Sequence, residues 1–281
     1  MPLNKIYLEK IIKQALEEDL GMGDLTSTAI FSPDHQSKAE IIVKEETIVC
    51  GIPIAEQVFS VLSPKIDFIP FYQDGDHVNV HTVIAEITGP THLLLSGERI
   101  ALNFLQRLSG IANLTAKYVF RVKNYPAKIV DTRKTTPGLR FLEKYAVRTG
   151  GGTNHRLGLF DAVMIKDNHI KAAGGIREAV QKVKNGIPFL TPIEVEVSTV
   201  DEALVALEAG VDVIMLDNMP AREMARAVKL IAGRALVEAS GGITFERLEE
   251  VAATGVDIIS VGALTHSAVS VDISMKIKDV Y

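Results

Sequence analysis

The spacing of apolar residues predicts two long helices in the first part of the chain. Over residues 4–18, apolar positions recur at helical spacing between charges. We expect this helix to end before Gly21 and Gly23, which permit the backbone of a turn. A second helical pattern covers residues 96–118. Because glycine weakens a helix interior, we expect this helix to break or bend near Gly110, and we place a domain boundary there.

Short strands are predicted between these helices and again near the end of the chain. Runs of β-forming residues at 39–43, 78–80 and 83–87 lie between Gly, Pro and Asp residues, and residues 54–62 predict a helix among them. Residues 269–277 alternate between apolar and polar, which is the pattern of a half-buried strand. We expect this last strand to return to the first domain.

The second half of the chain has a repeating character. Apolar runs recur there, each ending in polar residues and followed by a helical stretch, at 128–131, 162–165, 193–197, 213–216, 235–237 and 258–261. The segments GVDVIML at 210–216 and GVDIISV at 255–261 repeat one strand-forming pattern. These runs favour a parallel sheet of βα units. Periodicity leaves open whether the sheet curls into a barrel or remains a doubly wound sheet.

Composition and charge narrow the class of protein. The 281 residues are 47% hydrophobic and 23% charged, enough apolar material for two unequal domains. A net charge of −5 disfavours a nucleic-acid partner. The apolar runs fall short of the ~18 residues that a membrane span needs, and the charged first helix does not resemble a signal peptide. The single cysteine, Cys50, cannot form an intrachain disulfide, so we expect a cytoplasmic protein acting on small molecules.

Polar side chains gather where the predicted parallel strands end, which is where active sites of such architectures lie. In strand order these residues are Arg133 and Lys134, Lys166 and Asp167, Glu196, Asp217 and Asn218, Ser240 to Gly242, and Gly262. Cations dominate the first strands and carboxylates the later ones. The edge therefore offers one half suited to anions and one suited to hydroxyl groups or a metal ion.

The cationic half favours a ligand with several negative charges. The loop DTRKTTPGLR carries Arg133 and Lys134, donors suited to phosphate or carboxylate oxygens, although an ordinary solvated loop has a similar composition. Three glycines at 150–152 precede His155 and Arg156, and they let the backbone approach a ligand or let the loop move. The spacing of the histidines does not match zinc motifs.

Lys166 has a second interpretation, because a desolvated lysine at a barrel strand end can form a Schiff base, as in an aldolase. The number of cations around it argues for an anionic ligand instead. On the carboxylate side, Glu194 and Glu196 face the same way, and Glu196 lies nearer the strand end. Together with Asp217 it is suited to ribose hydroxyls or Mg²⁺, while Gly241 and its neighbours offer N–H groups to a phosphate.

Taken together, these segments resemble the quinolinate phosphoribosyltransferase family along almost the whole chain. The matching segments, in family order, are GDLTS at 23–27, GERIALNFLQRLSGIA at 97–112, DTRKTTPGLR, GGGTNHRLGLFDAVMIKDNHI, EVEVS, IMLDN, EASGGI and ISVGALTHS. The resemblance implies an N-terminal α/β sandwich domain, residues 1–110 joined by the tail 267–281, and a C-terminal open, TIM-like α/β barrel over residues 111–266. It decides for a barrel where periodicity did not.

The resemblance also implies the chemistry and the residues that carry it. It implies transfer of phosphoribosyl from phosphoribosyl pyrophosphate to quinolinate, with loss of carbon dioxide and pyrophosphate, to give nicotinate mononucleotide in de novo NAD synthesis. Mg²⁺ would be held mainly through the substrate, with Glu196 and Asp217 as possible ligands. A homodimer is implied, in which Arg99 reaches the neighbouring site. The catalytic candidates are Lys134, Lys166, Glu196 and Asp217.

The implied substrate contacts are wider than the catalytic set. They comprise Arg99, Thr132, Arg133, Lys134, His155, Arg156, Lys166, Glu196, Asp217, Ser240, Gly241, Gly242, Gly262, Ala263 and Leu264. Asp167 has two open roles, near the ribose or as the partner that holds Lys166. The alternative activities are nicotinate phosphoribosyltransferase, the Schiff-base aldolase and a non-catalytic barrel that binds an anionic metabolite.

Overall fold

The computed structural model describes residues 3–280, and the chain divides into two compact units. The first comprises residues 1–114, 137–150 and 267–281, and the second comprises residues 115–136 and 151–266. The division after residue 114 lies close to the expected boundary at 110. The segment 137–150, however, belongs to the first unit although its neighbours in sequence belong to the second.

The first helices of the first unit begin and end at residues suited to those positions. The helix α1 (Lys5–Leu20) begins after Asn4, whose side chain accepts the N–H groups of Ile6 and Tyr7. It ends at Gly21, with φ of 50°, as predicted. Two further helices follow, α2 (Leu25–Ile30) and α3 (Ile52–Leu62), and α3 begins two residues before the predicted residue 54.

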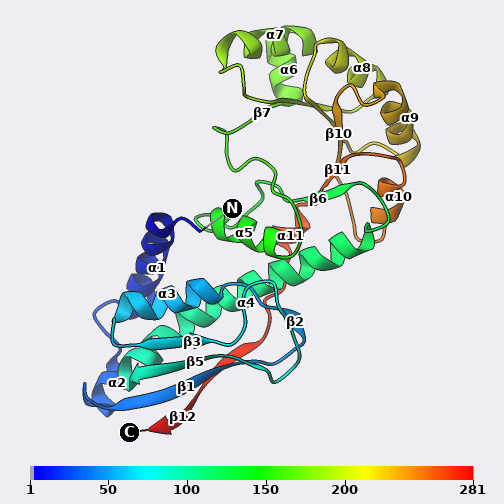
Figure 1. The fold of residues 1–281 in the computed structure, drawn as a ribbon. Coiled ribbons are helices and arrows are strands. Elements are labelled where there is room, and N and C mark those ends of the chain that lie inside the picture. The colour runs from blue at the N-terminus through cyan, green and yellow to red at the C-terminus, as the bar shows by residue number, and fades with distance from the viewer. Residues whose placement is uncertain (1–2, 281) are drawn as a thin grey trace. The chain divides into compact units, whose positions relative to one another are not determined.

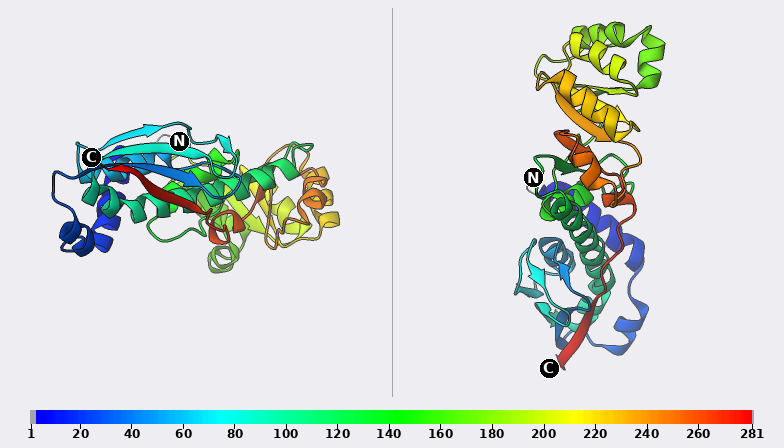
Figure 2. Two further views of the ribbon diagram at one scale, coloured as in Figure 1. Left: turned by 90° about the horizontal axis from the view of Figure 1, so that it is seen from below. Right: turned by 90° about the vertical axis from the view of Figure 1, so that its right-hand side faces the viewer.

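A four-stranded antiparallel sheet forms the other layer of the first unit. Its order is β12 (Ile273–Val280), β1 (Gln36–Val43), β5 (Val83–Pro90) and β3 (Asp67–Pro70). Because β12 pairs with β1, the predicted return of the tail to the first domain is confirmed, although the strand begins at 273 rather than 269. A small pair, β2 (Thr47–Ile48) and β4 (His77–Val78), lies apart from this sheet. Figures 1 and 2 show α3 and α4 along one face of the large sheet.

The predicted break at Gly110 is wrong, because α4 (Thr91–Arg121) is continuous through this residue. A Cβ atom on Gly110 would lie 2.1 Å from the carbonyl oxygen of Val269, so the glycine permits a close approach of two backbones. A second glycine, Gly97, plays a similar part against α3, where a Cβ would lie 2.7 Å from Leu62 Cδ1. The last residues of α4, 115–121, belong to the second unit.

The second unit is built on six parallel strands, and each predicted run overlaps one of them, although β9 and β10 extend beyond their predicted ends. In spatial order they are β6 (Lys128–Val130), β11 (Ile258–Ser260), β10 (Leu236–Ser240), β9 (Val213–Asp217), β8 (Ile193–Val197) and β7 (Val163–Ile165). The edge strands β6 and β7 are neighbours in sequence but do not pair, so the barrel is open between them. Thr153 forms a parallel bridge to Val130 on the outer side of β6.

Helices connect the strands in the order that βα units require. Figure 1 shows them around the outside of the curved sheet. They are α6 (Asp167–Ala173), α7 (Ile176–Gly186), α8 (Val200–Glu208), α9 (Ala221–Ile231), α10 (Leu248–Ala252) and α11 (Ala263–His266). The remaining helix, α5 (Arg140–Thr149), lies in the first unit. Of the helices in the described chain, none has both the length and the apolar character needed to cross a membrane.

Candidate active site

A pocket of about 550 Å³ lies at the carboxyl ends of the parallel strands, within the second unit. Strands β7, β9 and β10 each contribute residues at or just after their last position, and β8 contributes Glu196, one residue before its end. The lining residues are Thr132, Arg133, Lys134, His155, Arg156, Met164, Lys166, Glu196, Met215, Asp217, Asn218, Glu238, Ser240, Gly241, Gly242 and Ser260. The sequence therefore predicted most of the polar lining of this pocket.

The carboxylate of Glu196 pairs with the ammonium of Lys166 across two neighbouring strands. Lys166 directly follows β7 and Glu196 belongs to β8, and their side chains form an ion pair. The backbone N–H of Lys166 also donates to His169 Nδ1 at 3.0 Å, which fixes the start of α6. Lys166 is thus held by Glu196 rather than by Asp167, which is exposed as the first residue of α6.

The cationic side of the pocket contains a guanidinium with an unmade hydrogen bond. Arg156 donates from Nη1 to the carbonyl of Ala162 at 3.0 Å. Its Nε is buried and has no hydrogen-bond partner within the described residues. Burial, followed by the charge of Arg133, lowers the pKa of Arg156. A buried guanidinium N–H without an acceptor is costly, so this arrangement is suited to an incoming anion.

A buried carboxylate that sequence reasoning did not rank holds the glycine-rich loop in place. Asp131, directly after β6, is fully buried and accepts the backbone N–H of His155 at 2.9 Å and the side-chain amide of Asn154 at 2.6 Å. The N–H of Thr153 donates to Ile129 of β6. These bonds anchor the loop along the open edge of the barrel. The signal in the sequence was an Asp directly after a buried strand.

The side chain of His155 lies between two buried carboxylates. Its Nε2 is 3.2 Å from Glu194 and 3.4 Å from Glu238, which are 6% and 1% exposed. The prediction that Glu194 and Glu196 face the same way is confirmed, because both side chains reach residues that line the pocket. Glu238 was missed. The same alternation would have found it, since Glu238 lies two residues before Ser240 in β10.

The end of β9 shows why a glycine follows β10. Asp217 accepts the side-chain amide of Asn218 at 2.8 Å, and the N–H of Asn218 donates to the carbonyl of Ser240. A Cβ atom on Gly241, whose φ is 81°, would lie 2.5 Å from the Asn218 side chain. Only glycine therefore fits here without strain, and the backbone of 241–242 faces the pocket next to Asp217.

Four of the candidate residues do not line this pocket. Gly262 lies beside it, since a Cβ atom there would be 3.2 Å from the Lys134 side chain. Ala263 and Leu264 begin α11, and Leu264 is fully buried. Arg99 is an exposed residue of α4 in the first unit.

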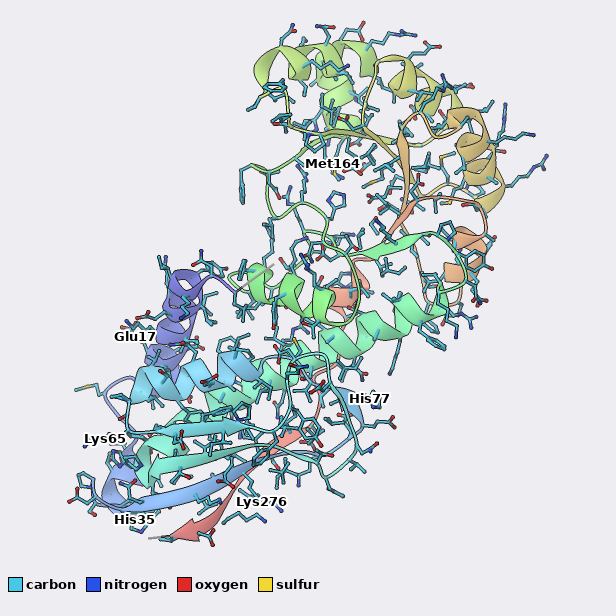
Figure 3. The ribbon with its side chains drawn as sticks, viewed as in Figure 1. Glu17, His35, Lys65, His77, Met164 and Lys276 are labelled. Atoms are coloured by element: carbon cyan, nitrogen blue, oxygen red, sulfur yellow. The ribbon has the colours of Figure 1, made fainter. Side chains whose placement is uncertain are left out.

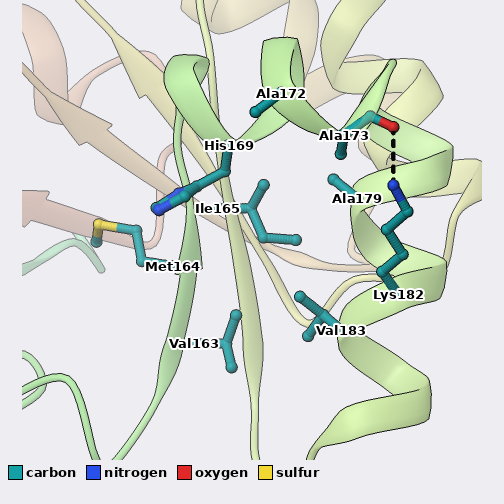
Figure 4. Close-up of a pocket in the computed structure, with 9 residues that line it drawn as sticks. All are labelled: Val163, Met164, Ile165, His169, Ala172, Ala173, Ala179, Lys182 and Val183. Carbon is teal, nitrogen blue, oxygen red and sulfur yellow. Dashed lines mark hydrogen bonds between the residues drawn. The ribbon is translucent and has the colours of Figure 1, made fainter.

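A second pocket, of about 440 Å³, lies behind the edge strand β7 (Figure 4). It is lined mainly by aliphatic side chains of β7, α6 and α7. Lys182 donates across it to the carbonyl of Ala173 at 3.1 Å. Met164, labelled in Figure 3, lines both pockets. Because few polar groups converge here, the first pocket is the better candidate for catalysis.

Comparison with known protein families decides between the activities that the pocket would allow. A model described as the N-terminal domain of quinolinate phosphoribosyl transferase matches residues 24–109, and one described as the C-terminal domain matches residues 111–276. The chain belongs to the quinolinate phosphoribosyltransferase family. The resemblance stated from the sequence is confirmed, and members of this family are pentosyltransferases of NAD biosynthesis.

Individual members of the quinolinate phosphoribosyltransferase family match over nearly the whole chain. A probable nicotinate-nucleotide pyrophosphorylase (carboxylating) of Bacillus subtilis is 48% identical over 98% of this chain and 95% of its own length. A quinolinate phosphoribosyltransferase (decarboxylating) of Nicotiana tabacum is 41% identical over 98% of this chain and 84% of its own. The crystal structure of NadC from Streptococcus pyogenes superposes with a TM-score of 0.95 at 42% identity, covering 99% of this chain and all of that one.

A more distant structure shares the fold alone with this family. Human nicotinic acid phosphoribosyltransferase superposes with a TM-score of 0.60 at 11% identity, over 100% of this chain and 75% of that one. The open α/β barrel with its N-terminal companion, expected from the resemblance, is confirmed.

Proposed function

We propose that the pocket of the second unit transfers a phosphoribosyl group from phosphoribosyl pyrophosphate to the ring nitrogen of quinolinate, with loss of carbon dioxide. Pyrophosphate and nicotinate mononucleotide are the other products. Family membership supports this reaction, as do the names of the relatives, which are called carboxylating or decarboxylating. The observation that carries it is the buried, unpartnered Nε of Arg156 beside Arg133, Lys134 and Lys166.

The two carboxylates of quinolinate bind at the cationic side of the pocket. Arg133 and Arg156 offer planar donor forks that match carboxylate geometry, and Lys166 offers a point charge. His155 directly precedes Arg156 in the chain and also lines the pocket. The three cations Arg133, Arg156 and Lys166 suit a dicarboxylate better than nicotinate, which has a single carboxylate.

The phosphoribosyl group binds on the opposite side of the pocket. Glu196 and Asp217 accept hydrogen bonds from the ribose hydroxyls, and the backbone N–H groups around Gly241 and Gly242 donate to the 5′-phosphate. Gly262 and the first residues of α11, Ala263 and Leu264, extend this phosphate subsite beside Lys134. These phosphate contacts come from backbone N–H groups, which residues without a side chain, such as Gly241 and Gly242, can bring close to a ligand.

The chemistry follows from charge placed at the two ends of the reacting bond. The bond between the ribose carbon and pyrophosphate breaks, and the pyridine nitrogen supplies the electron pair for the new bond. Glu196 and Asp217 stabilise the positive charge that develops on the ribose, while Lys134 offsets negative charge on the leaving pyrophosphate. The pyridinium then stabilises the electron pair left on the neighbouring ring carbon as carbon dioxide departs. A proton binds this carbon in place of the lost carboxylate.

Mg²⁺ is the expected cofactor, bound mainly through the pyrophosphate oxygens of the substrate. The carboxylates of this chain fit such an ion, because Mg²⁺ prefers oxygen ligands and keeps several waters. Glu196 already pairs with Lys166, which leaves Asp217, half-buried at the end of β9, as the carboxylate that would approach the ion. When bound, the ion would neutralise charge on the departing pyrophosphate.

A homodimer is part of the proposal, with Arg99 of one protomer completing the pocket of its partner. The family resemblance suggests this arrangement, and Arg99 is exposed on α4. Subunit mixing tests it. Arg99→Ala and Lys166→Ala should each be inactive alone, yet equal mixing after subunit exchange should restore about a quarter of wild-type activity, because half the dimers regain one intact site of two. No recovery despite proven exchange would contradict the shared site.

We expect the enzyme to act in the cytoplasm. Cys50 is buried and forms no disulfide, as suits a reducing compartment. Localisation of a tagged copy in the source cells, compared with a secreted marker, tests this expectation.

The activity itself is tested by incubating the purified protein with quinolinate, phosphoribosyl pyrophosphate and Mg²⁺. Carbon dioxide and nicotinate mononucleotide should appear in equal amounts. Nicotinate offered in place of quinolinate should give no more than a trace of product, and product without carbon dioxide would move the assignment to nicotinate phosphoribosyltransferase. Borohydride should trap no adduct on Lys166, because phosphoribosyl transfer involves no Schiff base between a lysine and a carbonyl carbon.

A further inference from the structure

Two buried carboxylates meet one histidine behind the anion-binding side of the pocket. Glu194 belongs to β8 and Glu238 to β10, and β9 lies between these strands. His155 spans this gap, with Nε2 at 3.2 Å from Glu194 Oε2 and 3.4 Å from Glu238 Oε2. One ring nitrogen therefore links three separate parts of the barrel wall, namely β8, β10 and the loop that follows the glycines.

The other bonds of His155 lead to the ligand side. Its backbone N–H donates to Asp131 at 2.9 Å, and its Nδ1 accepts the backbone N–H of Arg156 at 2.8 Å. Arg156 in turn donates from Nη1 to Ala162, while its Nε remains buried without a partner among the described residues. The ring thus connects the two carboxylates to the backbone of Arg156, whose guanidinium is suited to bind an anion.

The protonation of the ring follows from its neighbours. Burial alone would lower the pKa of His155, but hydrogen bonds and charge from Glu194 and Glu238 raise it to about 10. The N–H of Arg156 opposes a proton at Nδ1, because a cationic ring would place two hydrogens against each other there. Both observations leave a proton on Nε2, directed at the two carboxylates. The N–H of Arg156 also argues against a metal ion at Nε2, since a metal-bound neutral ring would carry its proton on Nδ1.

The carboxylates are expensive to keep in this position. Both are almost fully buried, and each has one oxygen, Oε1, with no hydrogen-bond partner in the described part of the chain. Burial, the largest cause, and the charge of Glu238 raise the pKa of Glu194, while His155 lowers it. Negative charges here also repel a dianionic substrate. On charge alone, the pocket would bind anions better without them.

We propose that Glu194 and Glu238 are positioning residues for the dicarboxylate subsite. They hold the His155 ring, and through its Nδ1 the backbone of Arg156, so that the guanidinium of Arg156 faces the substrate carboxylate in a fixed orientation. This inference rests on the proposed function, since it assigns the quinolinate carboxylates to Arg156. Neither carboxylate needs to touch the substrate. A loss of this support misplaces the donor fork, and small misplacements of such clamps are costly.

The direction of the change in the KM for quinolinate distinguishes a positioning role of Glu238 from a purely electrostatic one. Glu238→Leu removes both the acceptor and the charge, whereas Glu238→Gln removes the charge and keeps an oxygen acceptor. If the carboxylate acted only as a charge, both variants would lower the KM for quinolinate. We expect Glu238→Leu to raise it by roughly tenfold or more, and Glu238→Gln to raise it by less. The KM for phosphoribosyl pyrophosphate should change less than about twofold in both, because its subsite lies elsewhere. Glu223→Gln, at a half-buried carboxylate of α9 that does not line the pocket, is the matched control and should change neither KM.

A double-mutant cycle with His155 tests the path from the carboxylates to Arg156. Once His155→Ala has removed the ring, adding Glu238→Leu should change the quinolinate KM by less than about twofold, because the connection is already lost. Glu194→Leu should behave in the same way. Thermal unfolding of each variant identifies a folding defect. If Glu238→Leu does not fold, Glu238→Gln and Glu194→Gln still decide the matter through the ratio of the two KM values.

Several outcomes would overturn the proposal. These are a lower quinolinate KM in Glu238→Leu, an equal change in both KM values, or fully additive effects of Glu238→Leu and His155→Ala. Stoichiometric divalent metal in the purified protein that disappears in Glu238→Leu would overturn it as well, because the cluster would then be a metal site. Failure of the proposed function is a separate result, since it would appear as absence of product from quinolinate in the wild-type enzyme.

Discussion

Lys166 and Glu196 form an ion pair between the carboxyl ends of β7 and β8, at the floor of the candidate active site. In the proposed arrangement of substrates, the cation of this pair binds the dicarboxylate and its carboxylate binds the ribose. In the proposed reaction, substrate binding exchanges this contact for contacts with the two ligands.

Replacement of Lys166 should strongly reduce the catalytic activity. Lys166→Ala deletes a cation of the anion subsite and leaves Glu196 unpaired, so we expect kcat/KM for quinolinate to fall by about a hundredfold or more. Lys166→Arg keeps the charge and should retain part of the activity. Steady-state kinetics with both substrates measures this, and Lys182→Ala, in the neighbouring pocket, is the control. A fall of less than threefold in Lys166→Ala would show that the pair is structural only.

Replacement of Asp217 should change the dependence on metal. Asp217→Asn keeps the size of the side chain and removes the negative charge next to Asn218. We expect half-saturation by Mg²⁺ to require roughly tenfold more metal, because one direct or water-mediated oxygen ligand is weakened. Titration of activity with Mg²⁺ after treatment with a chelator measures the change. Glu196→Gln should leave the metal requirement closer to wild type, and equal shifts in both variants would show that the two carboxylates share the ion.

The sequence was sufficient for the strands of the barrel but not for its closure. Each of the six strands is a short run with at least one buried apolar residue, so its pattern can be recognised from neighbouring residues. Pairing is not local. The separation of β6 and β7 to opposite edges depends on contacts between residues far apart in the chain, and the family resemblance supplied what periodicity lacked.

Site residues at or near strand ends could be predicted from the sequence, whereas residues inside strands or on other segments could not. Lys166 and Asp217 follow apolar runs, and Glu196 lies one residue before the end of β8, so position near a strand end identified all three. Glu238 was hidden inside β10, where its buried side chain lies 3.4 Å from His155. The role of Gly110 could not be predicted, because the residue that requires a glycine there, Val269, lies some 160 residues away in the chain.

Gly110→Ala should destabilise the protein, against the usual preference of helices for alanine. In an exposed helix interior this change gains about 1 kcal/mol. Here the new methyl group would lie 2.1 Å from the carbonyl oxygen of Val269, so α4 and the segment leading to β12 must separate, at a cost of about 1–3 kcal/mol. Gly186→Ala, where nothing lies within 4 Å at the end of α7, is the matched control and should be neutral or slightly stabilising. Urea unfolding of the two variants measures the difference, and similar midpoints would contradict the close approach.

The motif GDLTS owes part of its character to a helix cap whose strength depends on pH. Asp24 begins α2 by accepting the N–H of Ser27 at 2.9 Å, and it also accepts the hydroxyl of Ser96 on α4 at 3.1 Å. Hydrogen bonds from the side chain and backbone of Ser27 lower its pKa from the ordinary value of 3.8. The ionised carboxylate is therefore the form that the folded state favours.

The sign of the pH dependence follows from that lowered pKa. The stability that Asp24 contributes is fully present above about pH 3.8, the value in the unfolded chain, and is lost as the pH falls through the lower pKa of the folded state. Asp24→Ala should cost about 1 kcal/mol at pH 6, as loss of a helix cap does, and less at pH 3. Asp24→Asn keeps an acceptor and should lose only the part that depends on charge. Urea unfolding of the three proteins between pH 6 and pH 3 provides the comparison. A gap between wild type and Asp24→Ala that stayed constant over this range would mean that the cap acts through geometry alone.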